Sequence, residues 1–133
     1  VSQINNIKNG VSWTDEDGSV IPSSRLTRPA DPPRSYAYCS DTCYLPELHK
    51  QLEGTTCIYH ETTYATEDAE KAAKYCHSTA AQAAQVARDA HAGRLLLGHY
   101  SSKYDNEQVL LDEARAVFPA SELTREGMVV ELK

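Results

Sequence analysis

From about residue 35 onward, short apolar runs alternate with longer amphipathic stretches. Apolar runs of this length predict strands, and they occur at residues 35–40, 55–59, 94–98 and 128–132. Stretches in which apolar residues recur every three to four positions predict helices, and they occur at residues 46–52, 66–75, 79–92 and 105–117. Strands that alternate with helices in this way are typical of an α/β fold.

The beginning of the chain has a different pattern. Glycine and proline recur there among polar residues, at Gly10, Gly18, Pro22, Pro29, Pro32 and Pro33. These residues favour turns and extended segments over long helices. We therefore expect a loop- or hairpin-rich lead-in segment at residues 1–34 and an α/β unit at residues 35–133.

Three of the predicted helices carry signals for their first turn. Thr79 and Gln82 have the spacing of a capping box, in which each side chain binds a backbone N–H of the other residue. Thr66 is placed to cap the helix that follows it. Asp105 and Gln108 repeat the capping-box spacing before the last predicted helix.

The charge balance limits the partners of the chain. It has 133 residues, with 19 acidic and 13 basic side chains and a net charge of -6. Binding to a phosphate backbone depends on lysine and arginine, which release counterions. An acidic chain of this kind is therefore not expected to hold RNA by itself, and another segment would have to do so.

Cysteine usage and hydropathy indicate the class of protein. The four cysteines include no C-x-x-C pair, so we expect reduced, buried thiols rather than a disulfide scaffold or a zinc ribbon. No apolar run approaches the roughly 20 residues that a membrane-spanning helix needs. We expect a soluble, cytoplasmic protein. Because the chain begins with Val rather than Met, we interpret it as part of a longer polypeptide.

Polar residues that can bind metals or transfer protons follow the predicted strands. Asp41 follows the first strand, His60 and Glu61 the second, and His99 the third, while His77 lies just before a predicted helix. In α/β sheets, ligands bind outside the carboxyl ends of the strands, and a helix N-terminus favours an anion. Together, the five residues predict a hydrolytic or metal site at one edge of the sheet.

Each of these residues also has a structural explanation. Asp41 is of the type that stabilises turns through its own backbone, Glu61 alone could be a solvated surface residue, and single histidines are common in cores and on surfaces. His49 and His91 lie inside predicted helices without a partner pattern. We assign these two histidines structural roles.

Four ordered motifs resemble a known family. They occupy residues 39–42 (CSDT), 60–64 (HETTY), 77–80 (HSTA) and 95–104 (LLLGHYSSKY). In this order and spacing they resemble the C-terminal half of ribonuclease Z, the tRNA 3′-processing endoribonuclease of the metallo-β-lactamase superfamily. The resemblance extends from about residue 35 to the end. It implies an α/β fold that is half of a metallo-β-lactamase-type αββα sandwich, with a mixed sheet and helices packed on one face.

The resemblance also implies roles for the site residues. Asp41 and His99 would be metal ligands, with the carboxylate of Asp41 bridging two ions. His77 would act on the scissile phosphate or the leaving oxygen, and Glu61 would orient it. His60 would shape the segment rather than bind metal.

Cofactors and partners follow from the same resemblance. We expect two zinc ions, since imidazole suits zinc, with manganese as the alternative in an oxygen-rich site. The expected partner is precursor tRNA, and the expected assembly is a homodimer with no membrane association.

The chain also departs from the family pattern. The metal-binding signature H-x-H-x-D-H is absent, because no two of its histidines stand two residues apart. We expect the missing N-terminal half to supply it, so this chain alone should bind metal weakly and lack activity. Smaller departures are Thr62 in place of Ala, Gly98 in place of Thr and Lys103 in place of Arg.

Two other functions remain open at this stage. Related metallo-hydrolases use the same ligands on small phosphodiesters or sulfate esters, because one fold serves many substrates. Alternatively, the chain could be a non-catalytic fragment or interaction module.

Overall fold

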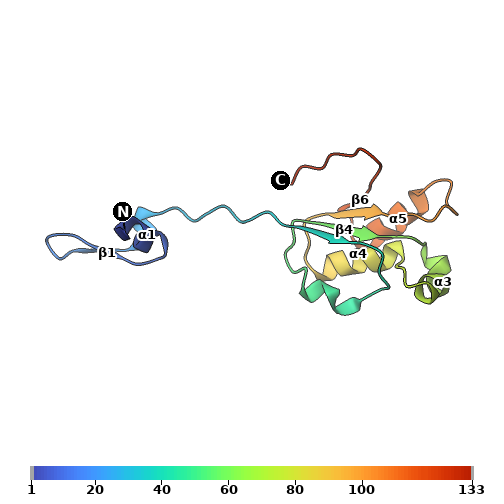
Figure 1. Ribbon diagram of the computed structural model, residues 1–133, viewed down its shortest axis with the longest axis horizontal. Coiled ribbons are helices and arrows are strands. Elements are labelled where there is room, and N and C mark those ends of the chain that lie inside the picture. Colours follow the sequence, from blue (N-terminus) through green and yellow to red (C-terminus); the bar gives the residue numbers. More distant parts are fainter. Residues whose placement is uncertain (1, 133) are drawn as a thin grey trace. The chain divides into compact units, whose positions relative to one another are not determined.

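The computed structural model describes residues 2–132, which form two compact units, residues 2–33 and residues 34–132 (Figure 1). Each unit has its own arrangement of elements and is described separately. Among the described residues, none of the helices combines the length and the apolar character that crossing a bilayer requires.

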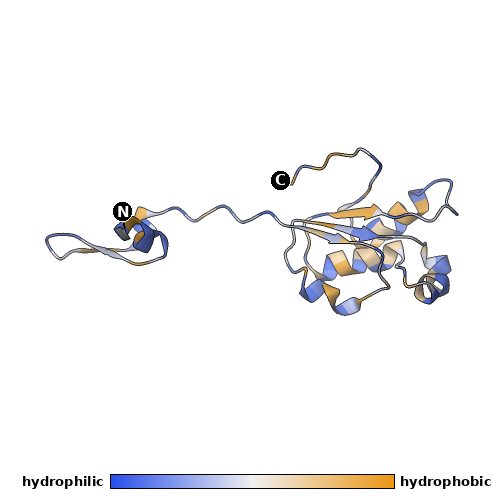
Figure 2. Ribbon diagram, in the orientation of Figure 1, coloured by the Kyte–Doolittle hydropathy of each residue, from blue (hydrophilic) through white to orange (hydrophobic). Residues whose placement is uncertain are grey.

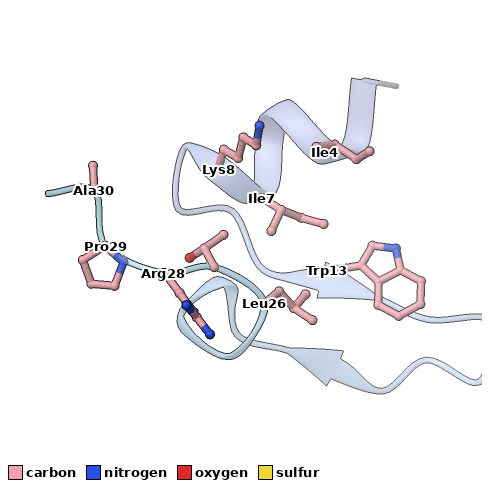
Figure 3. Close-up of a pocket in the computed structure, with 9 residues that line it drawn as sticks. Ile4, Ile7, Lys8, Trp13, Leu26, Arg28, Pro29 and Ala30 are labelled. Carbon is pink, nitrogen blue, oxygen red and sulfur yellow. The ribbon is translucent and has the colours of Figure 1, made fainter.

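The first unit is a small hairpin flanked by short helices. Strands β1 (Trp13–Thr14) and β2 (Val20–Ile21) pair antiparallel, and they are flanked by α1 (Ser2–Lys8) and α2 (Ser23–Leu26). The carboxylate of Asp15 closes the turn by accepting hydrogen bonds from the backbone N–H groups of Asp17 and Ser19. Ile4, Ile7, Trp13 and Leu26 line an apolar pocket of about 830 Å³ (Figure 3).

The second unit is built on a four-stranded sheet. Its strands are β3 (Tyr36–Cys39), β4 (Cys57–Glu61), β5 (Leu95–Gly98) and β6 (Ser121–Leu123), in the order β3-β4-β5-β6. The α/β class is confirmed, but the sheet differs from the expected mixed sheet in one respect. All three of its pairings are parallel, and within the described residues antiparallel pairing is confined to β1 and β2. Parallel pairing brings the carboxyl ends of β3, β4 and β5 to one edge.

Two helices cover one face of this sheet. Helices α4 (Ala80–Asp89) and α5 (Gln108–Val117) pack against each other and against the strands (Figure 1). Strand β5 is hydrophobic along its length (Figure 2) and is buried, as expected for a parallel strand inside a sheet. The core between sheet and helices includes Ile58, Ala80, Ala84, Ala87, Leu95, Leu97, Leu110 and Ala114. Small residues on α4 let that helix approach the sheet closely.

Shorter elements complete the unit. They are the 3₁₀ turns η1 (Pro46–Lys50) and η2 (Thr66–Asp68) and the helix α3 (Ala69–Lys74). Three expectations about this part of the chain are wrong. Residues 128–132 form no strand, and the last strand of the unit is β6. The last helix begins at Gln108 rather than at Asp105, and Thr66 starts a 3₁₀ turn and caps no helix.

The cysteines are free, as the sequence predicted, but they are not all buried. Cys57 is buried in β4, Cys39 and Cys43 are half-buried, and Cys76 is exposed. The exposure of Cys76 follows from its place in the turn between α3 and α4, where its φ of 55° lies in the left-handed region.

The other face of the sheet is aromatic, and within residues 34–132 of this unit no helix covers it. Tyr36 and Tyr38 of β3 are 50% and 64% exposed, and Tyr38 stacks on Tyr59 of β4 with ring centroids 4.8 Å apart. The Tyr59 ring lies directly over Gly98, so a Cβ at position 98 would overlap it. Glycine fits at position 98 because the Tyr59 side chain occupies the space that a Cβ would need there.

Candidate functional site

The carboxyl edge of the sheet gathers the residues that the sequence singled out. Parallel register pairs Cys39 with His60 and Glu61 with Gly98, so the residues that follow β3 and β5 flank the end of β4. The segment before α4 joins them through a bridge between Tyr64 and Thr79. The structure therefore brings Asp41, Glu61, His77 and His99 together.

Glu61 is the anchor of this edge. Its side chain is fully buried, and Oε1 accepts hydrogen bonds from the backbone N–H groups of Thr42 (3.2 Å) and Ser78 (3.0 Å) and from Nδ1 of His77 (2.9 Å). Oε2 accepts from the backbone N–H of Thr63 (2.9 Å) and from its hydroxyl (2.7 Å). Buried charge is tolerated when it is hydrogen-bonded in this way. The carboxylate thus ties three loops to the end of β4.

His77 is held in one orientation. Because a carboxylate only accepts hydrogen bonds, the contact with Glu61 assigns the proton on Nδ1 to His77. This leaves Nε2 as the ring atom that can act on a substrate. The side chain is 21% exposed, and its ring stacks against that of His99 with centroids 5.3 Å apart.

Asp41 and His99 face each other at the more open side of the edge. Oδ1 of Asp41 lies 3.2 Å from Nε2 of His99, and the two side chains are 56% and 44% exposed. His99 has a φ of 57°, in the left-handed region that is costly for a residue with a Cβ and that is often found at functional sites. A carboxylate oxygen and an imidazole nitrogen that converge in this way are suitable ligands for a divalent cation.

A second set of potential metal ligands overlaps with this pair. One ligand atom each from Glu61, His77 and His99 lies within 4.8 Å of the others. However, both oxygens of Glu61 already accept hydrogen bonds from N–H and O–H donors. The donor chemistry therefore fits a cation better at Asp41 and His99 than at Glu61.

The remaining histidines lie apart from this chemistry. His60 is 1% exposed, its Nδ1 donates to the carbonyl oxygen of Glu61 (2.7 Å), and its Nε2 has no partner among the described residues. Burial lowers the pKa of His60 below the ordinary value of 6.5. His49 contacts the carbonyl of Pro46 in its own 3₁₀ turn, and His91 pairs with Glu53 on the surface.

Lys103 takes part in a separate charged cluster. Its Nζ lies 2.6 Å from Asp68 and 3.2 Å from Glu67. The hydrogen bonds to these carboxylates, first that to Asp68, raise the pKa of Lys103. Two carboxylate partners leave this lysine less able to bind a phosphate group.

Sequence reasoning did not identify Thr63 as part of the site. Its hydroxyl contacts Glu61, His77 and His99 at 2.7, 3.2 and 2.9 Å. A signal was present in the position of Thr63 two residues after Glu61, because side chains two positions apart in an extended segment lie on the same side. Threonines are frequent in this chain, however, and nothing in the pattern distinguished this one.

Comparison with known proteins supports the resemblance drawn from the motifs. No protein-family model matches the chain. Proteins named ribonuclease Z from Bacteroides fragilis and Bacteroides thetaiotaomicron are each 47% identical to it over 132 residues, 99% of this chain. The chain spans only 43% and 42% of the length of these two relatives. The resemblance to ribonuclease Z is confirmed, and it concerns less than half of those proteins.

Solved structures share the fold. The metallo-β-lactamase fold protein YhfI from Bacillus subtilis matches 71% of this chain and 38% of its own, with a TM-score of 0.66 and 24% identity. Human tRNase Z, short form, matches 69% of this chain and 31% of its own, with a TM-score of 0.54 and 24% identity. The chain therefore has the fold of about half of a metallo-β-lactamase-type sandwich.

Proposed function

We propose that this chain is the C-terminal part of a ribonuclease Z, an endoribonuclease that removes the 3′ trailer of precursor tRNA by dinuclear-metal phosphodiester hydrolysis. The 47% identity to proteins of that name supports the family assignment. The observation that carries the chemistry is the placement of the His77–Glu61 pair beside the facing Asp41 and His99. These four residues provide a proton donor, its orienting carboxylate and two metal ligands.

His77 would supply the proton for bond cleavage. Its Nδ1–H is held by Glu61, so a protonated ring presents Nε2–H to the leaving group. Water attacks phosphorus and loses a proton to solvent, the P–O3′ bond breaks, and the proton on Nε2 passes to the departing ribose oxygen. General acid catalysis of this kind contributes about 10²–10⁴-fold in rate. Glu61 would keep the ring in place as the proton leaves.

Asp41 and His99 would hold the metal. Zinc suits the imidazole of His99, and manganese is also compatible with a carboxylate-rich site. When bound, a pair of such ions lowers the pKa of a coordinated water to near 7 and neutralises charge on the phosphate. Two ligands are fewer than the four that zinc prefers. The remaining ligands would come from an H-x-H-x-D-H motif in the part of the longer protein that this chain lacks.

The aromatic sheet face provides a place for that missing part. Tyr36, Tyr38, Tyr59 and Leu96 line a cavity of about 560 Å³ together with residues of the C-terminal segment. Exposed apolar surface of this kind is typical of an interface. We propose that the N-terminal half packs there, that the complete protein is a cytoplasmic homodimer, and that RNA is held mainly by segments outside this acidic chain.

The test uses the full-length protein and two substrates, precursor tRNA and bis(p-nitrophenyl) phosphate. We expect cleavage of the tRNA trailer, a loss of at least about 100-fold in kcat for His77→Ala, and less bound metal for Asp41→Asn. His91→Ala, at a surface position, is the control and should retain activity. This chain alone should show no turnover. Hydrolysis of the small ester without tRNA cleavage would exclude the nuclease and favour a small-molecule hydrolase.

A further inference from the structure

The hydroxyl of Thr63 lies between the two histidines and the carboxylate. It is 2.7 Å from Oε2 of Glu61, 2.9 Å from Nδ1 of His99 and 3.2 Å from Nδ1 of His77. Thr63 is 5% exposed. Its backbone is held at both sides, because its N–H donates to Glu61 and its carbonyl oxygen accepts from the N–H of Ser101. The hydroxyl therefore has a fixed position.

The number of available protons determines which atom donates and which accepts in each hydrogen bond of the Thr63 hydroxyl. A hydroxyl has one proton to donate, and the carboxylate of Glu61 only accepts, so the Thr63 proton points to Glu61. The hydroxyl oxygen can then only accept from the imidazoles. Nδ1 of His77 lies closer to Glu61 (2.9 Å) than to Thr63 (3.2 Å), so its proton is directed mainly to the carboxylate. The contact at 2.9 Å therefore requires the proton on Nδ1 of His99.

We propose that Thr63 is a positioning residue that fixes the tautomer and ring orientation of His99. With the proton on Nδ1, Nε2 of His99 keeps a lone pair for a cation. The carboxylate of Asp41, 3.2 Å from Nε2, would by itself favour the proton on Nε2, and the shorter contact of Nδ1 with the Thr63 hydroxyl, at 2.9 Å, opposes this. Glu61 thus orients two imidazoles, His77 directly and His99 through the hydroxyl of Thr63. Partners that hold the second nitrogen of a metal-binding imidazole act in this way, and their loss lowers metal affinity by about 10–100-fold.

The inference deepens the proposed function, because only that function makes Nε2 of His99 a metal ligand. The tautomer of His99 does not depend on the proposed function. A direct readout is the ¹⁵N spectrum of labelled histidine in the metal-free full-length protein, at a pH of about 8.5, two units above the ordinary imidazole pKa. His99→Gln identifies the signals. We expect the neutral ring of His99 to carry its proton on Nδ1.

Three variants separate the hydroxyl from the shape of the side chain. Thr63→Val keeps the shape and removes the hydroxyl, so it should give a mixture of both tautomers and about 10-fold weaker zinc binding. Thr63→Ser keeps the hydroxyl and should retain the Nδ1–H form. Thr62→Val is the matched control, because the neighbouring hydroxyl binds the carbonyl of Gly98 and contacts neither imidazole. It should leave the tautomer unchanged.

The outcomes distinguish this inference from the proposed function. A wild-type His99 protonated on Nε2, or a Thr63→Val spectrum identical to that of wild type, would overturn the role of Thr63. If Thr63→Val does not fold, the wild-type and Thr63→Ser spectra still decide the question. Full-length protein that shows the Nδ1–H tautomer but cleaves no tRNA would refute the nuclease and leave the positioning role intact.

Discussion

Among the side chains at the sheet edge, Glu61 accepts the most hydrogen bonds. It can do so because an ionised carboxylate has two acceptor oxygens and no donor. Five donor groups from the backbone and side chains of four residues point at its two oxygens. In Glu61→Gln, an NH₂ group replaces one oxygen and faces N–H or O–H donors. We expect a loss of about 3 kcal/mol in the free energy of unfolding, measured by urea denaturation.

The matched control is the same substitution on the surface. Glu53 pairs with His91, and the two side chains are 60% and 77% exposed. Exposed pairs contribute little to stability, so Glu53→Gln should change the free energy of unfolding by less than about 0.5 kcal/mol. Equal losses for the two variants would mean that the carboxylate of Glu61 is not the anchor of the edge.

His60 makes the stability of the chain depend on pH. Burial lowers its pKa in the folded state below the ordinary 6.5, so around pH 6 the unfolded chain binds a proton that the folded chain does not. Its contribution to stability is complete above about pH 6.5 and is lost as the pH falls toward the folded-state pKa.

Replacing His60 with Asn should remove that contribution and keep a donor for the carbonyl of Glu61. Between pH 7.5 and 5.5, the free energy of unfolding of wild type should fall by up to about 1.4 kcal/mol more than that of His60→Asn. Urea denaturation at both pH values measures this difference. Parallel pH dependence of the two proteins would show that His60 is not buried as a neutral ring.

Individual residues of the candidate site were predictable to different degrees. Asp41, Glu61 and His99 could be placed at one edge because each lies at or just after the end of a predicted strand. In a parallel sheet these carboxyl ends lie along the same edge. His77 was placed by its position just before a predicted helix, whose N-terminus favours an anion, since a turn between helices has no sheet register. Thr63 was missed because the role of a hydroxyl depends on its hydrogen-bond partners. These partners come from loops that lie next to each other only in the folded chain.

At the scale of the element, helix α4 starts as its sequence predicts. Thr79 accepts a hydrogen bond from the N–H of Gln82, and the Gln82 side chain accepts from the N–H of Thr79. Thr79→Val removes the accepting hydroxyl without a change of shape and should lower the free energy of unfolding by about 1 kcal/mol. Thr66→Val removes no helix cap. It removes an exposed hydrogen bond from the hydroxyl to Glu113, so it should cost less, about 0.5 kcal/mol.

Thermal or urea denaturation of both threonine variants decides this point. Equal effects at Thr79 and Thr66 would contradict the role of the capping box. The comparison is informative because both threonines were predicted to cap a helix, and only Thr79 does so in the fold.

Tertiary contacts account for the element predictions that failed. The hydroxyl and N–H of Thr66 bind the carboxylate of Glu113 on helix α5, so a partner 47 positions away replaces the expected local cap. At the other predicted cap, Asn106 rather than Asp105 binds the N–H of Gln108. Met128, Val130 and Leu132 line the cavity at the aromatic sheet face beside Tyr36 and Tyr59, and this contact needs hydrophobicity but no strand pairing.

At the scale of the molecule, local patterns predicted the α/β class, and only the resemblance predicted that the fold is half of a sandwich. A strand pattern does not tell whether a sheet face will be covered by this chain or by another part of a longer protein. Here the helices cover one face, and tyrosines remain exposed on the other. Relatives named ribonuclease Z are more than twice as long as this chain, and we propose that their additional part corresponds to a segment that covers this face.

The aromatic sheet face should therefore bind the N-terminal half when the two parts are co-expressed as separate chains. Tyr38 is 64% exposed on this face and stacks on Tyr59, so Tyr38→Lys should place a charge in the interface and weaken copurification at least about 10-fold. Tyr75→Lys is the matched control, because Tyr75 is 55% exposed beside α3, away from the sheet. If both variants reduce copurification equally, or neither does, the N-terminal half does not pack on the tyrosines.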